Sequence, residues 1–255
     1  MAAVLLTGGT GALGRAVEPA LLERGHTVRL LSRREPPAGR GPGTWVRGDL
    51  QTGDGLDTAA HGVDTIIHCA TSNGRGDIRS TENLIAAARK AGNPHLIYVS
   101  IVGVDSIPMS YYRAKFEAEQ RVETSALPWT ILRAAQFHKL VFALFAAQRR
   151  LPLVFAPDLL FQPIDVRDVA AHLAELAAAG PAGRAPDIGG PEILSAEEIA
   201  RLTLESLGVR RRVVPLRFPG KMFAAYKAGN NLVPGNPVGK RTFAEFAAEQ
   251  VAAGP

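Results

Sequence analysis

Hydrophobic and polar positions follow one pattern over the first half of the chain, where short apolar runs alternate with longer amphipathic segments. This pattern is typical of βαβ units in a parallel sheet. The predicted strands are Ala3 to Thr7, Thr27 to Ser32, Thr44 to Arg47, Thr65 to Cys69, His95 to Ser100 and Trp129 to Arg133. The predicted helices, with apolar residues at helical spacing, are Gly11 to Arg24, Ile78 to Ala91 and Tyr112 to Thr124. This order favours the α/β class with a doubly wound parallel sheet of the Rossmann type, which binds ligands outside the carboxyl ends of its strands.

After residue 133 the pattern becomes mainly helical, with only short apolar runs between the segments. The helical patterns cover Phe137 to Gln148, Val166 to Ala179, Ala196 to Leu207 and Pro219 to Ala228. No linker is long enough to separate two autonomous domains. The sequence therefore predicts a dinucleotide-binding core over residues 1–135. Residues 136–255 are predicted to form a small, mostly helical cap on the substrate side, interleaved with the last core elements in a single structural unit.

Composition places the chain among globular proteins, with 46% hydrophobic and 21% charged residues. The net charge of +5 comes from scattered basic residues, which indicates anionic ligands more than nucleic acid. Residues 140–160 are apolar but interrupted by arginines, prolines and an aspartate, so no membrane span is expected. One cysteine, Cys69, and the absence of a secretory signal pattern favour a reducing, cytoplasmic location. The expected state is a monomer or a homodimer, and no metal site is predicted.

A glycine-rich turn follows the first predicted strand and opens the first predicted helix. It satisfies both G-x-G-x-x-G and G-x-x-G-x-x-G and consists of Gly8, Gly9, Thr10, Gly11, Ala12, Leu13 and Gly14. Glycines let the backbone approach a pyrophosphate closely, and the N-terminus of the helix presents free N–H groups and a partial positive charge. Strand, turn and helix together predict a dinucleotide site.

The end of the second predicted strand decides between the two nicotinamide dinucleotides. An NAD enzyme places an acid there for the ribose 2′-hydroxyl, but this chain has Ser32, Arg33 and Arg34. Arginines can pair bidentately with a 2′-phosphate, and Arg15 at the start of the first helix is a further candidate. The predicted cofactor is NADP(H). The alternative interpretation is that Arg33 and Arg34 only form a solvated strand end.

Two further segments are predicted to contact the dinucleotide. After the third strand, the Asp49 carboxylate, followed by Leu50, is a candidate acceptor for the adenine amino group, and a helix N-cap is a compatible second role. After the fourth strand, the small residues Ala70 and Thr71 let the backbone lie against the cofactor. His68 is interpreted as a packed strand residue.

Tyr111 and Lys115 lie four residues apart at the start of a predicted helix, which places both side chains on one face. A neighbouring ammonium is expected to lower the pKa of the phenol from about 10 by stabilising the phenolate. Tyr111 is then a candidate proton donor or acceptor for a substrate oxygen while the nicotinamide exchanges hydride. Lys115 is also a candidate to hold the nicotinamide ribose.

Several segments together resemble the short-chain dehydrogenase/reductase superfamily and, within it, the atypical NmrA-like branch. They are Thr7 to Gly14, Gly48 to Leu50, Tyr98 to Ser100, Tyr111 to Lys115 and Pro163 to Ala170. The resemblance implies a Rossmann-type fold, NAD(P)(H) binding and a Ser-Tyr-Lys catalytic set. Ser100 is the nearest candidate for the serine, although Ile101 competes for that place. Tyr112 competes with Tyr111, and the interval between Ser100 and Tyr111 is shorter than in many members.

Gln136, Phe137 and His138 follow the sixth predicted strand and, with nearby phenylalanines, resemble the lining of an apolar pocket. Core packing is the other interpretation of these aromatic residues. The leading hypothesis is an NADPH-dependent oxidoreductase acting on a carbonyl, enone or quinone of a small apolar or aromatic molecule. Two alternatives stay open: a non-catalytic NADP(H)-binding redox sensor, which the resemblance also allows, and an isomerase or lyase with a resident nucleotide.

Overall fold

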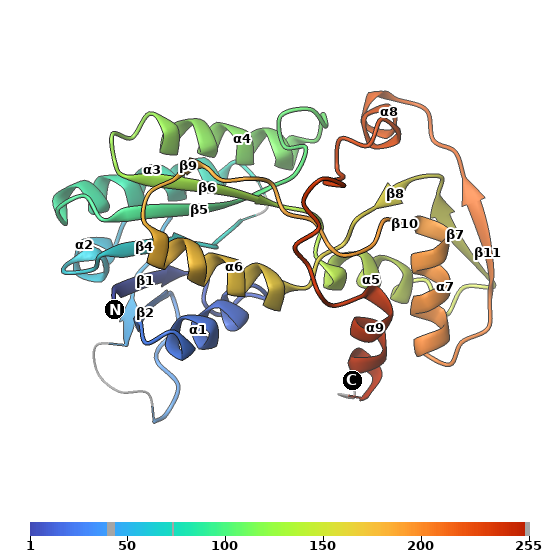
Figure 1. Ribbon diagram of the computed structural model, residues 1–255, viewed down its shortest axis with the longest axis horizontal. Coiled ribbons are helices and arrows are strands. Elements are labelled where there is room, and N and C mark those ends of the chain that lie inside the picture. The colour runs from blue at the N-terminus through green and yellow to red at the C-terminus, as the bar shows by residue number, and fades with distance from the viewer. Residues whose placement is uncertain (40–43, 73, 253–255) are drawn as a thin grey trace. The chain divides into compact units, whose positions relative to one another are not determined.

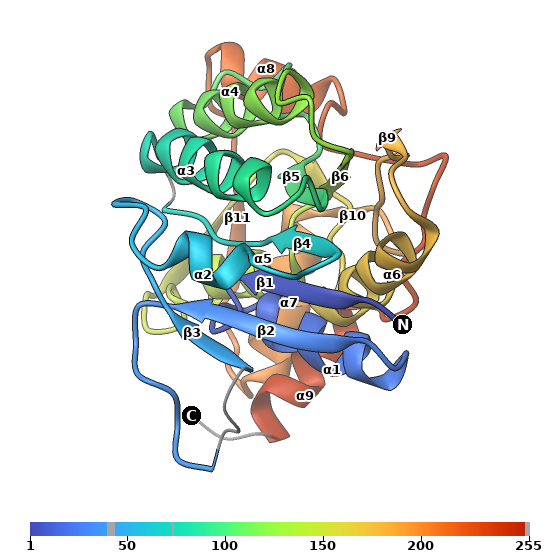
Figure 2. The same cartoon turned by 90° about the vertical axis from the view of Figure 1, so that its left-hand side faces the viewer.

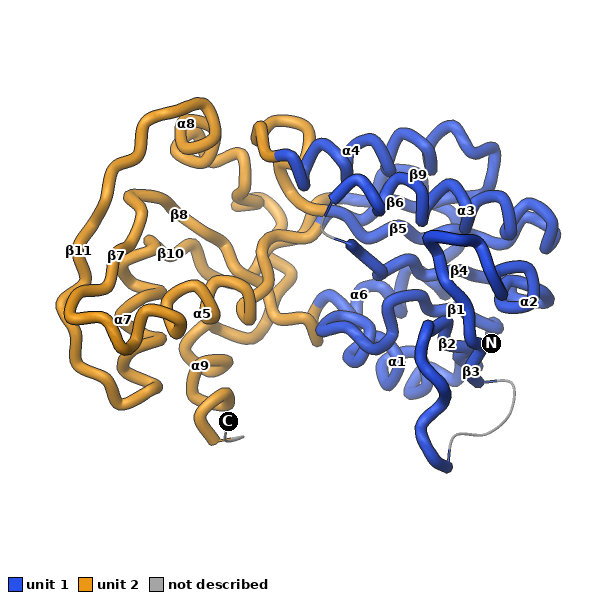
Figure 3. The backbone as a smooth tube through the Cα atoms, turned by 180° about the vertical axis from the view of Figure 1, so that it is seen from behind, with its two compact units in different colours: residues 1–100, 110–133, 169–186 blue, residues 101–109, 134–168, 187–255 orange. Residues whose placement is uncertain are grey.

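The computed structural model describes residues 1–39, 44–72 and 74–252 (Figure 1). Its contacts divide the chain into two compact units (Figure 3). Unit 1 comprises residues 1–100, 110–133 and 169–186, and unit 2 comprises residues 101–109, 134–168 and 187–255. The chain therefore passes between the two units several times. The sequence instead predicted one structural unit, with a core over residues 1–135 and a cap over residues 136–255 that is interleaved with the last core elements.

Unit 1 is built on a seven-stranded sheet with the strand order β3-β2-β1-β4-β5-β6-β9. The strands are β1 (Ala3–Thr7), β2 (Thr27–Ser32), β3 (Trp45–Arg47), β4 (Thr65–His68), β5 (His95–Ile101), β6 (Trp129–Ala134) and β9 (Gly183–Arg184). The pairs β1/β2, β1/β4, β2/β3, β4/β5 and β6/β9 are parallel. Every side chain of β4 is buried, as expected for a strand covered on both faces.

Helices cover both faces of this sheet. They are α1 (Gly14–Glu23), α2 (Leu56–Ala60), α3 (Gly76–Lys90), α4 (Ser110–Glu123) and α6 (Val166–Ala179). Figures 1 and 2 show α3 and α4 on one face and α1 and α6 on the other. Arg24, after α1, bonds Glu175 of α6 at 2.8 Å. The predicted Rossmann-type α/β class with a helical C-terminal segment is confirmed.

Unit 2 contains more strand than the helical pattern predicted. The strand β7 (Leu153–Pro157) pairs in parallel with β11 (Arg212–Leu216), and β8 (Leu160–Phe161) pairs antiparallel with β10 (Leu194–Ser195). Its helices are α5 (His138–Ala146), α7 (Ala196–Ser206), α8 (Lys221–Lys227) and α9 (Phe243–Ala252). Residues from α5, β7, α7 and α9 share one hydrophobic core. Within the described ranges, no helix is long and apolar enough to cross a membrane.

Candidate functional site

The glycine-rich turn occupies the segment between β1 and α1. Gly8 has φ +70°, a left-handed conformation that favours glycine. A Cβ added at Gly8 would lie 2.6 Å from the backbone nitrogen of Ala70, at the end of β4. A Cβ at Gly14 would overlap the Gly8 carbonyl oxygen and lie 2.5 Å from the Gly9 Cα. These glycines therefore let β1, α1 and the end of β4 approach one another closely.

Several backbone N–H groups of the turn are available to an anion. The Gly11 N–H closes the turn by donating to the Gly8 carbonyl at 2.9 Å. Among the described residues, the N–H groups of Thr10, Ala12 and Leu13 have no protein acceptor. They precede the positive end of the α1 dipole. A Cβ at Gly11 would meet only the Gly8 oxygen, at 3.2 Å, so the space beside the turn is open. This cradle fits a pyrophosphate.

Arginines lie beside the turn at the end of β2. Because Thr7 pairs with Leu31 in the sheet, the segment that begins at Ser32 starts next to the glycine turn. Arg33 and Arg34 are exposed, and neither forms an ion pair within the part of the chain that the structure describes. The Arg15 Nε donates to the Thr10 carbonyl at 3.0 Å, which holds its guanidinium at the same turn.

The loop after β3 is a fixed turn. The Asp49 Oδ1 accepts a hydrogen bond from the Gln51 N–H at 2.8 Å. The alternative role of Asp49 as a helix N-cap is wrong, because α2 begins only at Leu56 and its N-cap is Gly55. The Leu50 carbonyl accepts a bond from the Asn83 side chain at 2.8 Å, which ties the loop to α3. The predicted contact of Asp49 and Leu50 with adenine stays a prediction.

Lys115 of α4 is buried at the carboxyl end of β5, with only 4% of its surface exposed. Its Nζ donates to the Val99 carbonyl at 2.8 Å and lies 4.2 Å from the centroid of the Tyr98 ring. Burial lowers the pKa of Lys115 to about 8, while the Asp77 carboxylate acts in the opposite direction. The ammonium is thus held beside Ser100, the residue that follows Val99.

Ser100 is 3% exposed, and its Oγ has no hydrogen-bond partner within the described residues. A buried hydroxyl of this kind is costly unless a ligand or water satisfies it. Ile101, which the sequence left as a competitor, is the last residue of β5 and carries no hydroxyl.

Tyr111 lies in the first turn of α4 with its hydroxyl 3.3 Å from the Thr71 Oγ1. The Thr71 hydroxyl donates to the Asp77 Oδ2 at 2.6 Å. The competing Tyr112 is 4% exposed and packs edge-on against Tyr111. Burial raises the pKa of Tyr111, so the expectation that Lys115 lowers it is not met. The reason is that the ammonium of Lys115 is directed to a backbone carbonyl.

His68 at the end of β4 is a packed residue, as interpreted from the sequence. Its ring nitrogens lie 2.7 Å from the Thr7 Oγ1 and 3.3 Å from the Thr81 Oγ1. Burial lowers the pKa of His68 to about 3, so the ring stays neutral at physiological pH. Burial likewise raises the pKa of Cys69 to about 12, which leaves an unreactive thiol.

Asp77 is the site residue that sequence reasoning missed. It is 2% exposed in the first turn of α3, and it accepts bonds from Thr71 and from the backbone and hydroxyl of Ser72. An acid in the first turn of a helix is a common capping signal. Nothing in the sequence therefore set it apart.

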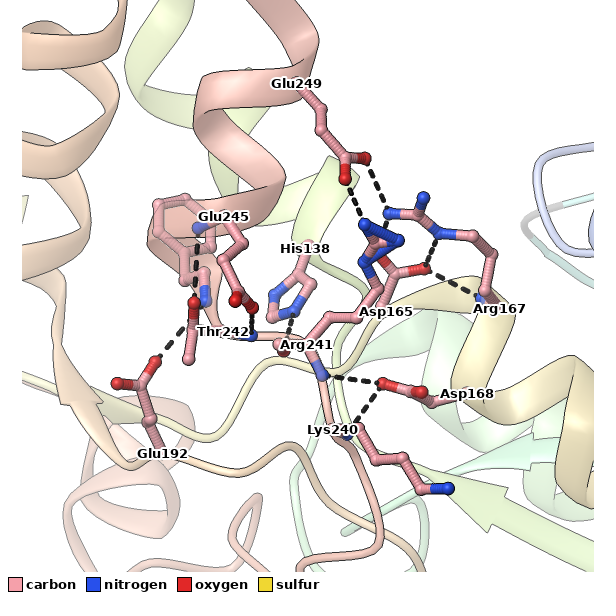
Figure 4. Close-up of polar contacts among 11 residues, drawn as sticks. His138, Asp165, Arg167, Asp168, Glu192, Lys240, Arg241, Thr242, Glu245 and Glu249 are labelled. Atoms are coloured by element: carbon pink, nitrogen blue, oxygen red, sulfur yellow. Dashed lines mark hydrogen bonds and ion pairs between the residues drawn. The ribbon is translucent and has the colours of Figure 1, made fainter.

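The three predicted substrate residues belong to unit 2. Gln136 is 7% and His138 1% exposed, and Phe137 is half-buried. The His138 Nε2 lies 3.0 Å from the Arg241 carbonyl oxygen (Figure 4). The His138 ring packs against Phe243 and Phe246 of α9. These contacts are those of a core residue of unit 2. The predicted role in a substrate pocket stays a prediction.

The segment before α6 forms an ionic cluster around the buried Asp165 carboxylate in unit 2 (Figure 4). The Asp165 side chain is 1% exposed. Its carboxylate accepts one hydrogen bond from the Arg167 backbone N–H at 2.8 Å and another from the Arg167 guanidinium at 2.7 Å. Arg167 also pairs with Glu249 at 2.8 Å, and Arg241 pairs with the same glutamate. The Asp168 carboxylate accepts the Lys240 N–H at 2.9 Å. The cluster thus fixes α9 to the start of α6.

Asp165→Asn is expected to destabilise the protein by about 1–3 kcal/mol, because a hydrogen-bonded charge would be lost from a buried position. Urea unfolding followed by circular dichroism measures this change. Glu197→Gln is the matched control, because Glu197 forms an exposed ion pair with Arg201, which is worth about 1 kcal/mol or less. Equal effects of the two substitutions would contradict a structural role for the cluster.

No group of three or more His, Cys, Asp or Glu side chains within the described residues could hold a metal ion.

Comparison with known proteins defines the class of this chain. The model of the NAD(P)H-binding family matches residues 8–178, which include both the glycine turn and the Tyr111–Lys115 segment. The chain belongs to this family.

Two of the relatives of this chain are reductases by name. A (4-alkanoyl-5-oxo-2,5-dihydrofuran-3-yl)methyl phosphate reductase from Streptomyces griseus is 35% identical over 222 residues, which are 84% of this chain and 76% of that protein. A chloroplastic divinyl chlorophyllide a 8-vinyl-reductase from Oryza sativa is 31% identical, over 83% of this chain and 60% of that protein.

Among solved structures, an NADPH-dependent quinone oxidoreductase from Escherichia coli in complex with NADPH has a TM-score of 0.82 at 18% identity. The match covers 97% of this chain and 99% of that one. A triphenylmethane reductase from Citrobacter in complex with NADP(H) has a TM-score of 0.76 at 17% identity, over 97% and 99%. These two likenesses show the fold.

Proposed function

We propose that this protein is an NADPH-dependent reductase of the short-chain dehydrogenase/reductase superfamily, in its NmrA-like branch. The observation that carries the proposal is the position of Ser100, Tyr111 and Lys115. They lie at the carboxyl end of β5 and in the first turns of α4, within the same unit as the glycine turn. A nucleotide on the turn and a substrate beside its nicotinamide would meet at this edge of the sheet.

The dinucleotide would be held by backbone and cationic groups. The free N–H groups of Thr10, Ala12 and Leu13 would bind the pyrophosphate, and the open space at Gly11 leaves room for it. Arg33 and Arg34, exposed beside the turn, would pair with a ribose 2′-phosphate. This charge pattern supports NADPH over NADH, since an acid at the strand end would repel the phosphate.

The side chains after β5 would orient and protonate the substrate. When bound, the dinucleotide supplies hydride to an electron-poor carbon. Ser100 has a buried hydroxyl in need of a partner and would hold the substrate oxygen. Tyr111 would donate its phenolic proton to that oxygen. Lys115 would keep positive charge at this edge and hold the nicotinamide ribose through its remaining N–H groups.

The substrate class is a conjugated or carbonyl compound of small, largely apolar character. The relatives act, by name, on a furanone phosphate and a vinyl group, and one structural neighbour acts on quinones. In each case hydride would be accepted by an electron-poor conjugated system. The expectation of an apolar substrate comes from the phenylalanine-rich sequence that begins at Phe137. Of these phenylalanines, Phe145 and Phe161 pack in the hydrophobic core of unit 2.

Arg33→Ala is expected to weaken NADPH binding by about 10-fold or more and to leave NADH binding within about twofold, because only NADPH carries the phosphate that an arginine pairs with. Fluorescence titration of each nucleotide gives the two dissociation constants. Arg29→Ala is a matched control, because the Arg29 guanidinium bonds backbone carbonyls at the C-terminal end of α2, including that of Ala59 at 2.8 Å. An unchanged NADPH constant for Arg33→Ala would refute the assignment of the 2′-phosphate site.

A further inference from the structure

The Tyr111 hydroxyl belongs to a chain of hydrogen bonds that ends on a buried carboxylate. We propose that Asp77, acting through Thr71, holds Tyr111 in its protonated form and so sets this site to reduce its substrate instead of oxidising it. The inference rests on the function proposed above. It adds a positioning residue, Asp77, and a direction of reaction.

The direction of each hydrogen bond follows from counting protons. Thr71 has one hydroxyl proton, and this proton lies on the 2.6 Å bond to the Asp77 Oδ2, since a carboxylate only accepts. The Thr71 oxygen is therefore left as an acceptor toward the Tyr111 hydroxyl, 3.3 Å away. Tyr111 must donate in this contact, and only its neutral phenol can do so. A Thr71 hydroxyl turned toward a phenolate would stabilise that phenolate, but Asp77 engages its proton.

Asp77 is fixed in place for this role. Its other oxygen, Oδ1, accepts the Ser72 hydroxyl at 2.7 Å and also the Ser72 backbone N–H. The side chain is 2% exposed and lies in the first turn of α3, where the helix dipole favours a negative charge. The carboxylate therefore presents a defined oxygen to Thr71.

The other groups that face Tyr111 reinforce this effect. Burial raises the pKa of Tyr111, and the negative charge of Asp77 and the neighbouring Tyr112 raise it further. Tyr98 of β5 also faces Tyr111 and is neutral, since burial raises its pKa. Lys115 of α4, a cation on the same helix, directs its Nζ to the Val99 carbonyl. The hydrogen bond with Thr71 acts in the opposite direction and lowers the pKa of Tyr111, but the Thr71 proton lies on the bond to Asp77.

A protonated Tyr111 favours one direction of chemistry. In reduction, the O–H bond of Tyr111 breaks as a new O–H or C–H bond forms on the substrate that receives hydride, and water then returns a proton to the phenolate. In oxidation, the resting enzyme must instead carry a phenolate that removes the proton of an alcohol. A network that disfavours the phenolate therefore keeps the acid form ready and depletes the base form.

The test is a spectroscopic titration of phenolate absorbance in the whole protein without nucleotide. Subtracting the curve of Tyr111→Phe isolates Tyr111 from the other three tyrosines. Asp77→Asn is expected to lower the apparent pKa of Tyr111 by about one pH unit or more, because the charge is lost and the Thr71 proton is released. Asp57→Asn is the matched control: Asp57 is 63% exposed and pairs with Lys90. It should leave the titration unchanged.

Thr71→Val separates the hydrogen-bond route from a direct charge effect, and it stays informative if Asp77→Asn does not fold. Alone, it should lower or leave unchanged the pKa of Tyr111, because an acceptor of the phenolic proton is removed. In the T71V background, Asp77→Asn should shift the pKa by no more than about half of its effect in the wild-type background. A rise in the pKa with Thr71→Val, an unchanged titration with Asp77→Asn, or equal shifts in both backgrounds would overturn the proposal.

The titration needs no turnover, so its failure is distinct from failure of the proposed function. If the protein reduces a substrate, the alkaline limb of its pH–rate profile should move to lower pH with Asp77→Asn, because Asp77 raises the pKa values of both Tyr111 and Lys115. If the alkaline limb of the pH–rate profile did not move with Asp77→Asn, the proposed role of Asp77 would also be overturned. If the Tyr111 titration shifted as expected but the protein reduced no probe, only the proposed reductase function would be refuted.

Discussion

Replacing Tyr111 by phenylalanine is expected to lower kcat by roughly 10²- to 10⁴-fold, the usual contribution of a positioned general acid. The change removes one hydroxyl from a half-buried ring and leaves the glycine turn intact. The NADPH dissociation constant should therefore stay within about twofold, since the loss concerns the transition state alone. Stopped-flow measurement of NADPH oxidation with a quinone or enone probe, beside a binding titration, gives both quantities.

Tyr112→Phe is the control, because Tyr112 is the adjacent residue in α4 and is buried. Its kcat should remain within a fewfold of the wild-type value, as expected for a side chain outside the reacting groups. If Tyr112→Phe instead abolished turnover while Tyr111→Phe preserved it, the assignment of the proton donor would be wrong.

Gly14→Ala is expected to weaken dinucleotide binding by about 10- to 100-fold, equal to roughly 1–3 kcal/mol of forced backbone movement. The added methyl group would overlap the Gly8 carbonyl oxygen and lie 2.5 Å from the Gly9 Cα. The turn must therefore open, and its N–H groups would no longer converge. Calorimetric titration with NADPH measures the loss, and thermal unfolding without nucleotide measures the accompanying loss of stability.

Alanine substitutions at two other glycines distinguish an effect on folding stability from an effect on dinucleotide binding. A Cβ at Gly235 would meet nothing within 4 Å, so Gly235→Ala should change neither quantity. A Cβ at Gly11 would meet only the Gly8 oxygen at 3.2 Å, so Gly11→Ala should fold normally yet occupy the space beside the turn. If Gly11→Ala bound NADPH as well as the wild type does, the pyrophosphate would lie elsewhere.

Much of the fold could be predicted because its signals are local. The strands β1 and β2 have the predicted bounds, since apolar runs between turn residues define a buried parallel strand. The helix α1 begins at Gly14 instead of Gly11, because the residues before it form the tight turn. By contrast, β7 and β11 are short strands that contain or end in proline, a residue that argues against a strand in a sequence.

The C-terminal helix α9 was missed although its start has a sequence signal. Thr242 and Glu245 form a reciprocal capping pair, in which the Thr242 N–H donates to Glu245 at 2.8 Å and the Glu245 N–H donates to Thr242 at 3.2 Å. The spacing T-x-x-E before apolar residues is visible in the sequence. This signal predicts α9, and only its apolar partners on α5 and α7 needed the structure.

Most residues of the candidate site could be predicted from the sequence, but the hydrogen bonds between them could not. The glycine turn, Tyr111 and Lys115 follow from spacing. That Lys115 bonds Val99 and that Tyr111 meets Thr71 depend on how three chain segments come together, which spacing does not encode. Asp77 enters only through such a contact. For the same reason the sequence predicted a lowered pKa for Tyr111, whereas burial raises it.

The central claim is that this site transfers hydride from NADPH to a small electron-poor molecule and that Tyr111 supplies the proton. The most direct measurement uses NADPH carrying deuterium at both C4 positions of the nicotinamide, with a panel of a cyclic enone, an acyclic enone and an aromatic ketone, and mass spectrometry of the products. The account predicts that the wild-type protein transfers deuterium to carbon of at least one probe and that Tyr111→Phe does so at least about 100-fold more slowly. Tight NADPH binding with no deuterium in any product would contradict it and would favour a redox sensor.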